Sequence, residues 1–182
     1  IDVLSESARF ADASPDMVKA IVEGLGAFAN AEFAPLNHIG DAVGARIVDG
    51  EVQMPNGYRQ AYQAYVDGGW GAINAPVEFG GMGLPFSLAT VALDSLGGGN
   101  MAFTLCPMLS VGALEAVAHH GSEKQKEMYL PKLSSGAWTG TMNLTEPQAG
   151  SDVGALKSTA TPRGDGTYQI RGQKIYITFG DH

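Results

Sequence analysis

Apolar residues recur at intervals of three and four along residues 17–29, which is the spacing of one face of an α-helix. Ser14-Pro15-Asp16 comes just before this run and supplies an N-cap, a proline and an acid in the order that a helix start favours. Helical spacing returns over residues 58–66 and is ended by Gly68 and Gly69. The pattern therefore predicts one helix after Ser14, bounded by Pro35, and another over residues 58–66.

Two stretches between and after these helices lack regular apolar spacing. Residues 36–56 are rich in Gly, Asp and Asn, which predicts an exposed excursion with at most short strands at Arg46–Val48 and Glu51–Gln53. Residues 80–83 read Gly-Gly-Met-Gly, a composition that phosphate-binding loops share. Because no Lys-Ser or Lys-Thr pair follows them, we interpret these glycines as a structural turn.

The centre of the chain is strongly apolar. Residues 86–96 and 101–117 predict two helices with almost no charge, separated by residues 97–100 and buried on most sides. Ser122-Glu123-Lys124-Gln125 is a capping box that opens a short exposed helix, which Pro131 is expected to end. His119-His120 fits the negative end of a helix dipole better than a metal site, and no metal ligand set is predicted.

The hydrophobic period changes after Trp138. Four short segments rich in Thr, Tyr and Ile predict strands, connected in part by Asp165-Gly166 and Gly172-Gln173: residues 139–144, 158–161, 168–171 and 174–178. The predicted fold class is therefore α+β. An all-helical domain (residues 1–135) is followed by the first strands of an antiparallel β domain (residues 136–182) that is incomplete at His182.

Composition removes several functional classes. The net charge of −8 and the absence of a basic run argue against nucleic acid as a partner. Cys106 is the single cysteine, so no intrachain disulfide is possible, and we expect a buried core thiol. Gly, Pro, Asn or a charge interrupts every apolar run, so no membrane span is predicted.

The candidate chemistry lies in residues 142–153, Met-Asn-Leu-Thr-Glu-Pro-Gln-Ala-Gly-Ser-Asp-Val. Gly150 allows close backbone approach to a ligand, and the hydroxyls of Thr145 and Ser151 could donate to carbonyl or phosphate oxygens together with the loop amides. A Pro-Gly-Ser-Asp turn that merely connects two strands gives the same pattern. The residues by themselves leave both interpretations open.

Longer motifs carry a family resemblance. Leu144 to Val153 closely resembles the flavin-loop signature of the acyl-CoA dehydrogenases, and Gly172 to Thr178 is similar to that family's second signature. The resemblance extends upstream through residues 78–85 and 121–126 and covers most of the chain from about Gly57. It implies a helical domain and the start of a β domain, with a C-terminal helical bundle expected beyond residue 182.

The resemblance implies a flavoenzyme of fatty acid metabolism. Such an enzyme uses FAD to remove hydrogens from the α and β carbons of an acyl-CoA thioester, leaving a trans-2-enoyl-CoA. The base of the family is a glutamate on the C-terminal bundle, so no catalytic residue is assigned within this chain, and residues 1–182 alone are expected to be inactive.

Matching positions imply two sets of contacts. FAD would be bound by seven residues: Met142, Leu144, Thr145, Gly150, Ser151, Tyr176 and Thr178. The acyl-CoA substrate would be bordered by Ser151 and, near the acyl tail, by Met108 and Gly112. Asn143, Tyr176 and Phe179 depart from the usual motif residues. The tail after Thr178 is most similar to larger members of the superfamily, including the 3-methylmercaptopropionyl-CoA dehydrogenases.

Other functions share these motifs. A flavin oxidase or monooxygenase has the same fold, and a non-catalytic flavoprotein resembling the alkylation-response proteins is a further alternative. The family implies a homodimer or homotetramer that passes electrons to an electron-transfer flavoprotein. It also implies a cytoplasmic location in bacteria or the mitochondrial matrix in eukaryotes, with any targeting region outside these residues.

Overall fold

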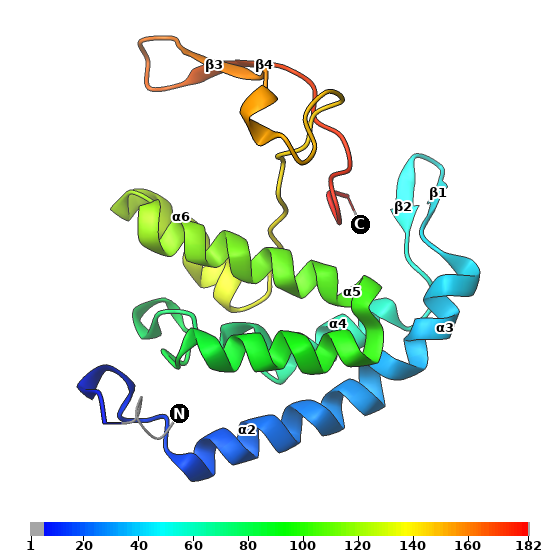
Figure 1. Ribbon diagram of the computed structural model, residues 1–182, viewed down its shortest axis with the longest axis vertical. Coiled ribbons are helices and arrows are strands. Elements are labelled where there is room, and N and C mark those ends of the chain that lie inside the picture. The colour runs from blue at the N-terminus through cyan, green and yellow to red at the C-terminus, as the bar shows by residue number, and fades with distance from the viewer. Residues whose placement is uncertain (1–5, 182) are drawn as a thin grey trace. The chain divides into compact units, whose positions relative to one another are not determined.

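The computed structural model describes residues 6–181, which divide into a helical unit that runs to Gly140 and a small second unit, Thr141–Gly180 (Figure 1). The structure is helical with two separate two-stranded antiparallel sheets. This confirms the predicted α+β fold class.

The first helix begins where the sequence predicts, but the helical segment does not end where it predicts. After a 3-10 turn, η1 (Ala8–Phe10), helix α2 (Pro15–Phe28) starts at Ser14, whose hydroxyl accepts the Met17 amide at 3.3 Å. The expected stop at Pro35 is wrong. A π-helical turn, η2 (Ala29–Phe33), leads directly into α3 (Ala34–Val43), with Pro35 in its first turn. Proline is tolerated there because the amides of a first helical turn need no partner from the turn before.

The short strands of the excursion are confirmed. Strands β1 (Arg46–Val48) and β2 (Glu51–Gln53) pair antiparallel, with Ile47 opposite Val52. Asp49 and Gly50 connect them and both have positive φ, at 53° and 85°, as the tightest hairpin turns require. Helix α4 (Tyr58–Asp67) follows and ends at Gly68, as predicted.

The glycine loop is a structural turn. It follows the 3-10 turns η3 (Trp70–Ala72) and η4 (Val77–Phe79). The Met82 amide donates to the Ala72 carbonyl at 2.8 Å and the Gly83 amide to the Ala75 carbonyl at 2.9 Å. Both donors are used inside the fold, so they are not available to hold a phosphate.

Helix α5 (Phe86–His120) replaces the two helices that the sequence predicts. Gly97 to Gly99 remain helical, and the break comes at Asn100, with φ −157° and ψ 90°. The Asn100 side chain accepts the Phe103 amide at 3.1 Å, which caps the second half of the helix from within. The result is one long helix with a kink at a buried asparagine.

Helix α5 is less buried than its composition predicts. Met101 keeps 57% and Phe86 52% of its surface exposed. By length and composition alone, α5 is also apolar enough to cross a membrane, contrary to the expectation that every apolar run is too short. The core helix of a soluble protein passes the same test, and α5 packs against α2, α3 and α6. Of the apolar window that passes this test, 33% is buried inside the protein.

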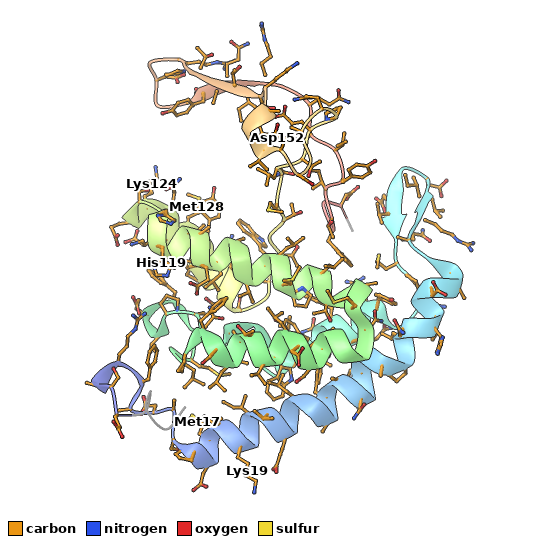
Figure 2. The ribbon with its side chains drawn as sticks, in the orientation of Figure 1. Met17, Lys19, His119, Lys124, Met128 and Asp152 are labelled. Atoms are coloured by element: carbon orange, nitrogen blue, oxygen red, sulfur yellow. The ribbon has the colours of Figure 1, made fainter. Side chains whose placement is uncertain are left out.

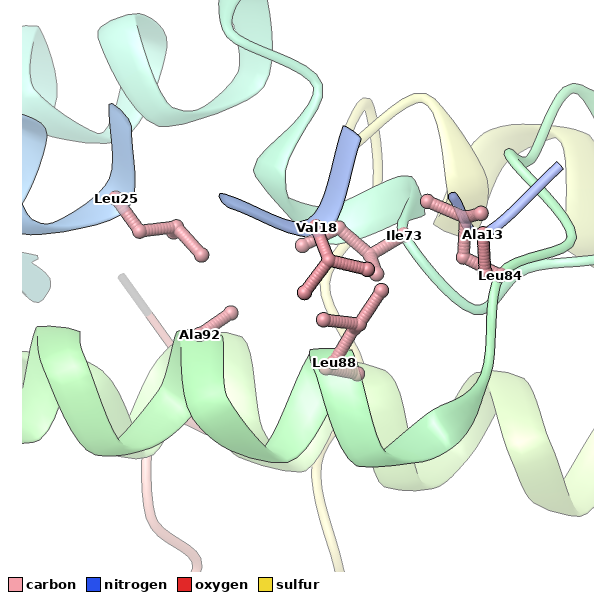
Figure 3. Close-up of a cluster of buried hydrophobic side chains, with 8 residues drawn as sticks. Ala13, Val18, Leu25, Ile73, Leu84, Leu88 and Ala92 are labelled. Atoms are coloured by element: carbon pink, nitrogen blue, oxygen red, sulfur yellow. The ribbon is translucent and has the colours of Figure 1, made fainter. Parts of the chain in front are cut away.

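The core forms where α2, the turns after α4 and the first half of α5 meet. Leu25, Ile73 and Leu88 are each at most 1% exposed, and Figure 3 shows them with their neighbours. Burying one such side chain contributes about 1.5–3 kcal/mol. Next to Asn100, the rings of Phe33 and Phe103 stack with centroids 4.5 Å apart.

Helix α6 (Glu123–Ser134) begins with the predicted capping box: the Gln125 side chain accepts the Ser122 amide at 2.8 Å. It does not end at Pro131, which lies inside it, three residues before its end. The Pro131 carbonyl still accepts the Ser135 amide, so the last turn closes despite the missing N–H. Within residues 6–181, no group of His, Cys, Asp and Glu could hold a metal ion.

The second unit contains one regular hairpin. Strands β3 (Thr159–Pro162) and β4 (Tyr168–Arg171) pair antiparallel around Asp165-Gly166, as predicted. Residues 139–144 and 174–178 are not strands, and Gly172-Gln173 makes no hairpin between strands. A strand needs a run of ladder bonds, and here a single backbone bond runs from the Ile175 amide to the carbonyl of Thr145, which lies just after the first segment.

Substitution of Gly81 tests the structural turn. An added Cβ would lie 2.0 Å from the Ala75 carbonyl oxygen, which is backbone and cannot swing aside. We expect Gly81→Ala to destabilise the protein by about 1–3 kcal/mol. Gly98→Ala is the control, because its Cβ would meet nothing within 4 Å. That change should be neutral or stabilise α5 by about 0.5–1 kcal/mol. Denaturant unfolding measures the free energy of unfolding of both variants. Equal values for the two would contradict the close packing of Gly81.

Candidate functional site

The second unit brings the two motif segments side by side. The Thr141 hydroxyl donates to the Thr178 carbonyl at 2.7 Å, and the Ile175 amide donates to the Thr145 carbonyl at 3.0 Å. The two segments therefore run antiparallel although neither forms a strand. The structure thus gathers Met142, Leu144 and Thr145 of one motif with Tyr176 and Thr178 of the other.

A tight turn shapes the loop between the segments. The amides and carbonyls of Glu146 and Ala149 exchange two hydrogen bonds, at 2.9 and 3.0 Å, around Pro147-Gln148. Ala149 is buried, and the chain then reaches Gly150, where an added Cβ would find nothing within 4 Å. Ser151 and Asp152 are exposed beyond it, just before the 3-10 turn η5 (Val153–Ala155) (Figure 2). The open space at Gly150 permits the close backbone approach that the sequence predicts.

Apolar side chains of both segments face solvent. Met142 is 57%, Leu144 37% and Tyr176 85% exposed. Such exposure is costly unless another surface covers it. Thr145 and Thr178 are half-buried and offer hydroxyl groups. Exposed apolar groups, hydroxyls and an open glycine fit a ligand that combines a flat ring system with polar oxygens, as FAD does.

Glu146 organises this unit, a role that was not predicted from the sequence. Its carboxylate is almost fully buried and accepts four hydrogen bonds. One oxygen receives the Lys174 ammonium at 2.8 Å and the Ser158 amide at 3.1 Å. The other receives the Lys157 amide and the Gln148 side chain, both at 2.7 Å. The sequence does contain an acid in the first motif and a lysine in the second. Their spacing along the chain, however, does not reveal that the two side chains pair.

These contacts keep Glu146 ionised. The Lys174 ammonium, followed by hydrogen bonds from Ser158 and Lys157, holds the pKa of the Glu146 carboxyl well below its usual range. A carboxylate with a lowered pKa and every oxygen occupied is a poor proton acceptor. Glu146 is therefore a structural anion and not a general base.

The two remaining predicted site residues belong to the helical unit. Met108 and Gly112 lie one turn apart on an exposed face of α5, and Gly112 has open space around it. The face behind them is buried against Tyr62 and Tyr65, and the hydroxyl of Tyr62 donates to the Gly136 carbonyl at 3.0 Å. Burial raises the pKa of Tyr62 to about 12, so this hydroxyl stays protonated. Met108 and Gly112 are thus accessible, with packed core behind them.

Cys106 is buried, as predicted. Burial raises the pKa of its thiol to about 11. Because the thiolate is the reactive form, this cysteine is chemically inert at neutral pH.

Comparison with known proteins decides the family. Residues 16–137 match the model of the acyl-CoA dehydrogenase N-terminal domain, which covers most of the chain. The chain belongs to the acyl-CoA dehydrogenase family. This confirms the resemblance seen in the two motifs.

One relative within the family is similar over nearly the whole chain. The 3-methylmercaptopropionyl-CoA dehydrogenase of Ruegeria pomeroyi is 49% identical over 167 residues, which are 92% of this chain and 28% of that protein. The chain therefore spans little more than a quarter of that curated relative.

Two solved structures share the fold. One, a structure of the electron transferring flavoprotein of Acidaminococcus fermentans, matches with a TM-score of 0.76 and 30% identity over 92% of this chain and 41% of the other. An acyl-CoA dehydrogenase from Bacillus anthracis complexed with FAD matches with a TM-score of 0.74 and 23% identity, over 92% and 27%. The second likeness shows the fold alone.

The buried pair predicts a specific dependence of stability on pH. A carboxylate with a lowered pKa in the folded protein stabilises it above the unfolded pKa of about 4.3, and that contribution is lost as the pH falls further. Glu146→Gln should lower the melting temperature clearly at neutral pH. The gap from wild type should narrow steadily in acid.

Melting curves of both proteins, recorded by circular dichroism from neutral pH to about pH 3, measure this gap. Glu127→Gln removes an exposed carboxylate of α6 and serves as the control, with little expected effect. A gap for Glu146→Gln that stays constant into acid would mean that Glu146 carries no buried charge.

Proposed function

We propose that this chain forms part of an FAD-dependent acyl-CoA dehydrogenase that converts an acyl-CoA thioester to a trans-2-enoyl-CoA. The observation that carries the proposal is the pairing of the two motif segments by the Thr141–Thr178 and Ile175–Thr145 hydrogen bonds. The 49% identical relative acts on an acyl-CoA, which supports the substrate class. It also favours a short, thioether-containing acyl group of the kind that relative's name describes.

The residues present fit FAD. Met142, Leu144 and Tyr176 would cover the ring system with exposed apolar surface, and Thr145 and Thr178 would offer hydroxyls to its polar edge. Gly150 and Ser151 would border the phosphates and the substrate channel, where the backbone has room. When bound, FAD supplies a hydride acceptor, which no amino-acid side chain provides.

The remaining task of this chain is positioning. Met108 and Gly112 on the exposed face of α5 would border the acyl tail, since Gly112 leaves space beside the helix. Abstraction of the α proton needs a base whose pKa suits the task. Glu146 does not meet that requirement, so we assign no base within the described residues.

Partners follow from the family. The electron acceptor that the family resemblance implies is an electron-transfer flavoprotein. We further propose a homodimer or homotetramer, in the cytoplasm of a bacterium or the mitochondrial matrix of a eukaryote. The oxidase and alkylation-response alternatives receive no support from the relatives described above.

A direct test is anaerobic reduction of the FAD-loaded full-length protein by short acyl-CoA thioesters, including 3-methylmercaptopropionyl-CoA. The absorbance of oxidised flavin should disappear, and an enoyl-CoA should form in equal amount. Rapid reoxidation by oxygen with peroxide as product would favour the oxidase alternative instead. A protein that binds FAD but is reduced by no acyl-CoA would contradict the proposed activity.

Residues 1–182 alone should bind FAD weakly and turn over no acyl-CoA, since the chain spans about a quarter of the length of its relative. Purification of this segment with FAD in the buffer, followed by gel filtration, measures what is retained. Stoichiometric bound flavin would contradict the expectation.

Thr178→Val tests the role of the second motif. Valine keeps the β-branched shape and removes the hydroxyl, and the backbone carbonyl that accepts Thr141 remains. A hydrogen bond that strengthens during hydride transfer is worth on the order of 1–3 kcal/mol, so flavin reduction should slow roughly ten- to a hundredfold. Stopped-flow reduction of the full-length variant measures this rate. Thr161→Val on the exposed strand β3 is the control, and equal rates for both variants would remove Thr178 from the site.

A further inference from the structure

The Glu146 carboxylate joins three segments that are distant in the sequence. Glu146 lies at the turn around Pro147. It accepts hydrogen bonds from Lys157 and Ser158, which precede β3, and from Lys174 in the second motif. The side chain of Glu146 is 2% exposed and that of Lys174 27%. The pair is therefore shielded from the solvent that weakens surface ion pairs.

Lys174 makes a second bond that fixes the alignment of the two motif segments. Its ammonium donates to the Leu144 carbonyl at 2.9 Å as well as to Glu146 at 2.8 Å. The neighbouring residue, Ile175, binds the Thr145 carbonyl through its amide. Consecutive residues of the second motif thus hold consecutive carbonyls of the first, and a slip by one residue would break both contacts.

No other common side chain can replace Glu146 in this arrangement. All four groups around it are donors, so the site requires an acceptor with two oxygens. Glutamine would turn its own amide N–H₂ toward donors on one side. Aspartate keeps the charge but is shorter by one methylene, so it would pull the loop toward Lys174 or lose contacts.

We propose that Glu146 is a positioning residue that, through Lys174, sets the register of the two segments that hold the flavin. This inference rests on the proposed function, because it assumes that the segments bind FAD. Glu146 touches neither cofactor nor substrate in this role. It places Met142, Leu144 and Thr145 opposite Tyr176 and Thr178. Because both segments would contribute to the surface that contacts FAD, a shift of one segment against the other would disrupt that surface.

Acid should release FAD for the same reason. Lys174 is the charged side chain that contacts Glu146, and the remaining contacts are two backbone amides and the neutral Gln148. Protonation of Glu146 converts a carboxylate oxygen that accepts hydrogen bonds into an O–H group that faces other donors. It also leaves the Lys174 ammonium without its anion. The alignment is therefore held at neutral pH and lost as the pH falls below the ordinary carboxyl range.

The test uses the full-length protein, stripped of FAD and titrated with FAD while flavin fluorescence is followed. Melting of each apoprotein is measured in parallel. Glu146→Gln and Lys174→Met each leave an unmatched group and should weaken FAD binding at least tenfold. The double variant Glu146→Leu/Lys174→Met removes both charges, so its apoprotein should regain the part of the melting temperature that an unpaired charge costs, although the Lys157 and Ser158 amides still lack their acceptor. Its FAD affinity should remain at least tenfold below wild type, because the alignment is still not set.

Other variants separate positioning from general stability. Glu127→Gln, an exposed change on α6, should bind FAD as wild type does. Glu146→Asp keeps the charge, so it should fold and bind FAD with an intermediate affinity. The proposal is overturned if the double variant, or a folded Glu146→Asp, binds FAD as tightly as wild type. If the double variant does not fold, Glu146→Asp alone decides.

The wild-type protein separates this inference from the proposed function. A wild type that binds no FAD overturns both. A wild type that binds FAD and is reduced by acyl-CoA, while the variants bind FAD equally well, overturns the positioning role alone. FAD release that sets in with acid in wild type but is absent in the double variant supports the role of the Glu146 charge.

Discussion

The buried carboxylate of Glu146 constrains the small unit more than any other interaction in it. The unit has a single two-stranded sheet and little buried apolar surface, so regular secondary structure and a hydrophobic core do not hold its loops in place. Instead, four donors form hydrogen bonds to one carboxylate. One of them, the Lys174 ammonium, also donates to the Leu144 carbonyl. An ionised group with every oxygen bonded can order a loop that would otherwise lack a fixed shape.

This arrangement has a functional logic. Under the proposed function this loop approaches the cofactor closely, and the open space at Gly150 and the small side chain of Ser151 leave room for that approach. The stabilising contacts are displaced to the other side of the turn, where Glu146 and Ala149 are buried. Under the proposed function, the exposed apolar groups of Met142 and Tyr176 remain available for the ligand.

The helical unit uses a related device at Asn100. A polar side chain buried in an apolar helix is costly unless it is bonded, and Asn100 caps the second half of α5 while its amide reaches the Phe33 carbonyl at 3.4 Å. Gly99 lies against the backbone of η2, where a Cβ would be only 3.1 Å from the Ala29 carbonyl oxygen. The π-helical turn and the kink therefore meet at one point, and together they let two long helices pack closely. Met108, which is exposed, lies one turn before Gly112 in the second half of the same helix.

The sequence by itself determined the helix starts at Ser14 and Ser122, the short strands of the two hairpins and the family. Caps at Ser14 and Ser122, the Asp49-Gly50 turn and the contiguous motifs are all encoded by residues within a few positions of one another. Tertiary structure decided the rest. Pro35 and Pro131 do not end their helices, because the turns around them satisfy the backbone in other ways. The predicted strands at 139–144 and 174–178 lack a ladder, since pairing depends on a partner and not on composition. Glu146 and Lys174 lie 28 residues apart, so no local pattern could reveal that folding buries one carboxylate beneath four donors.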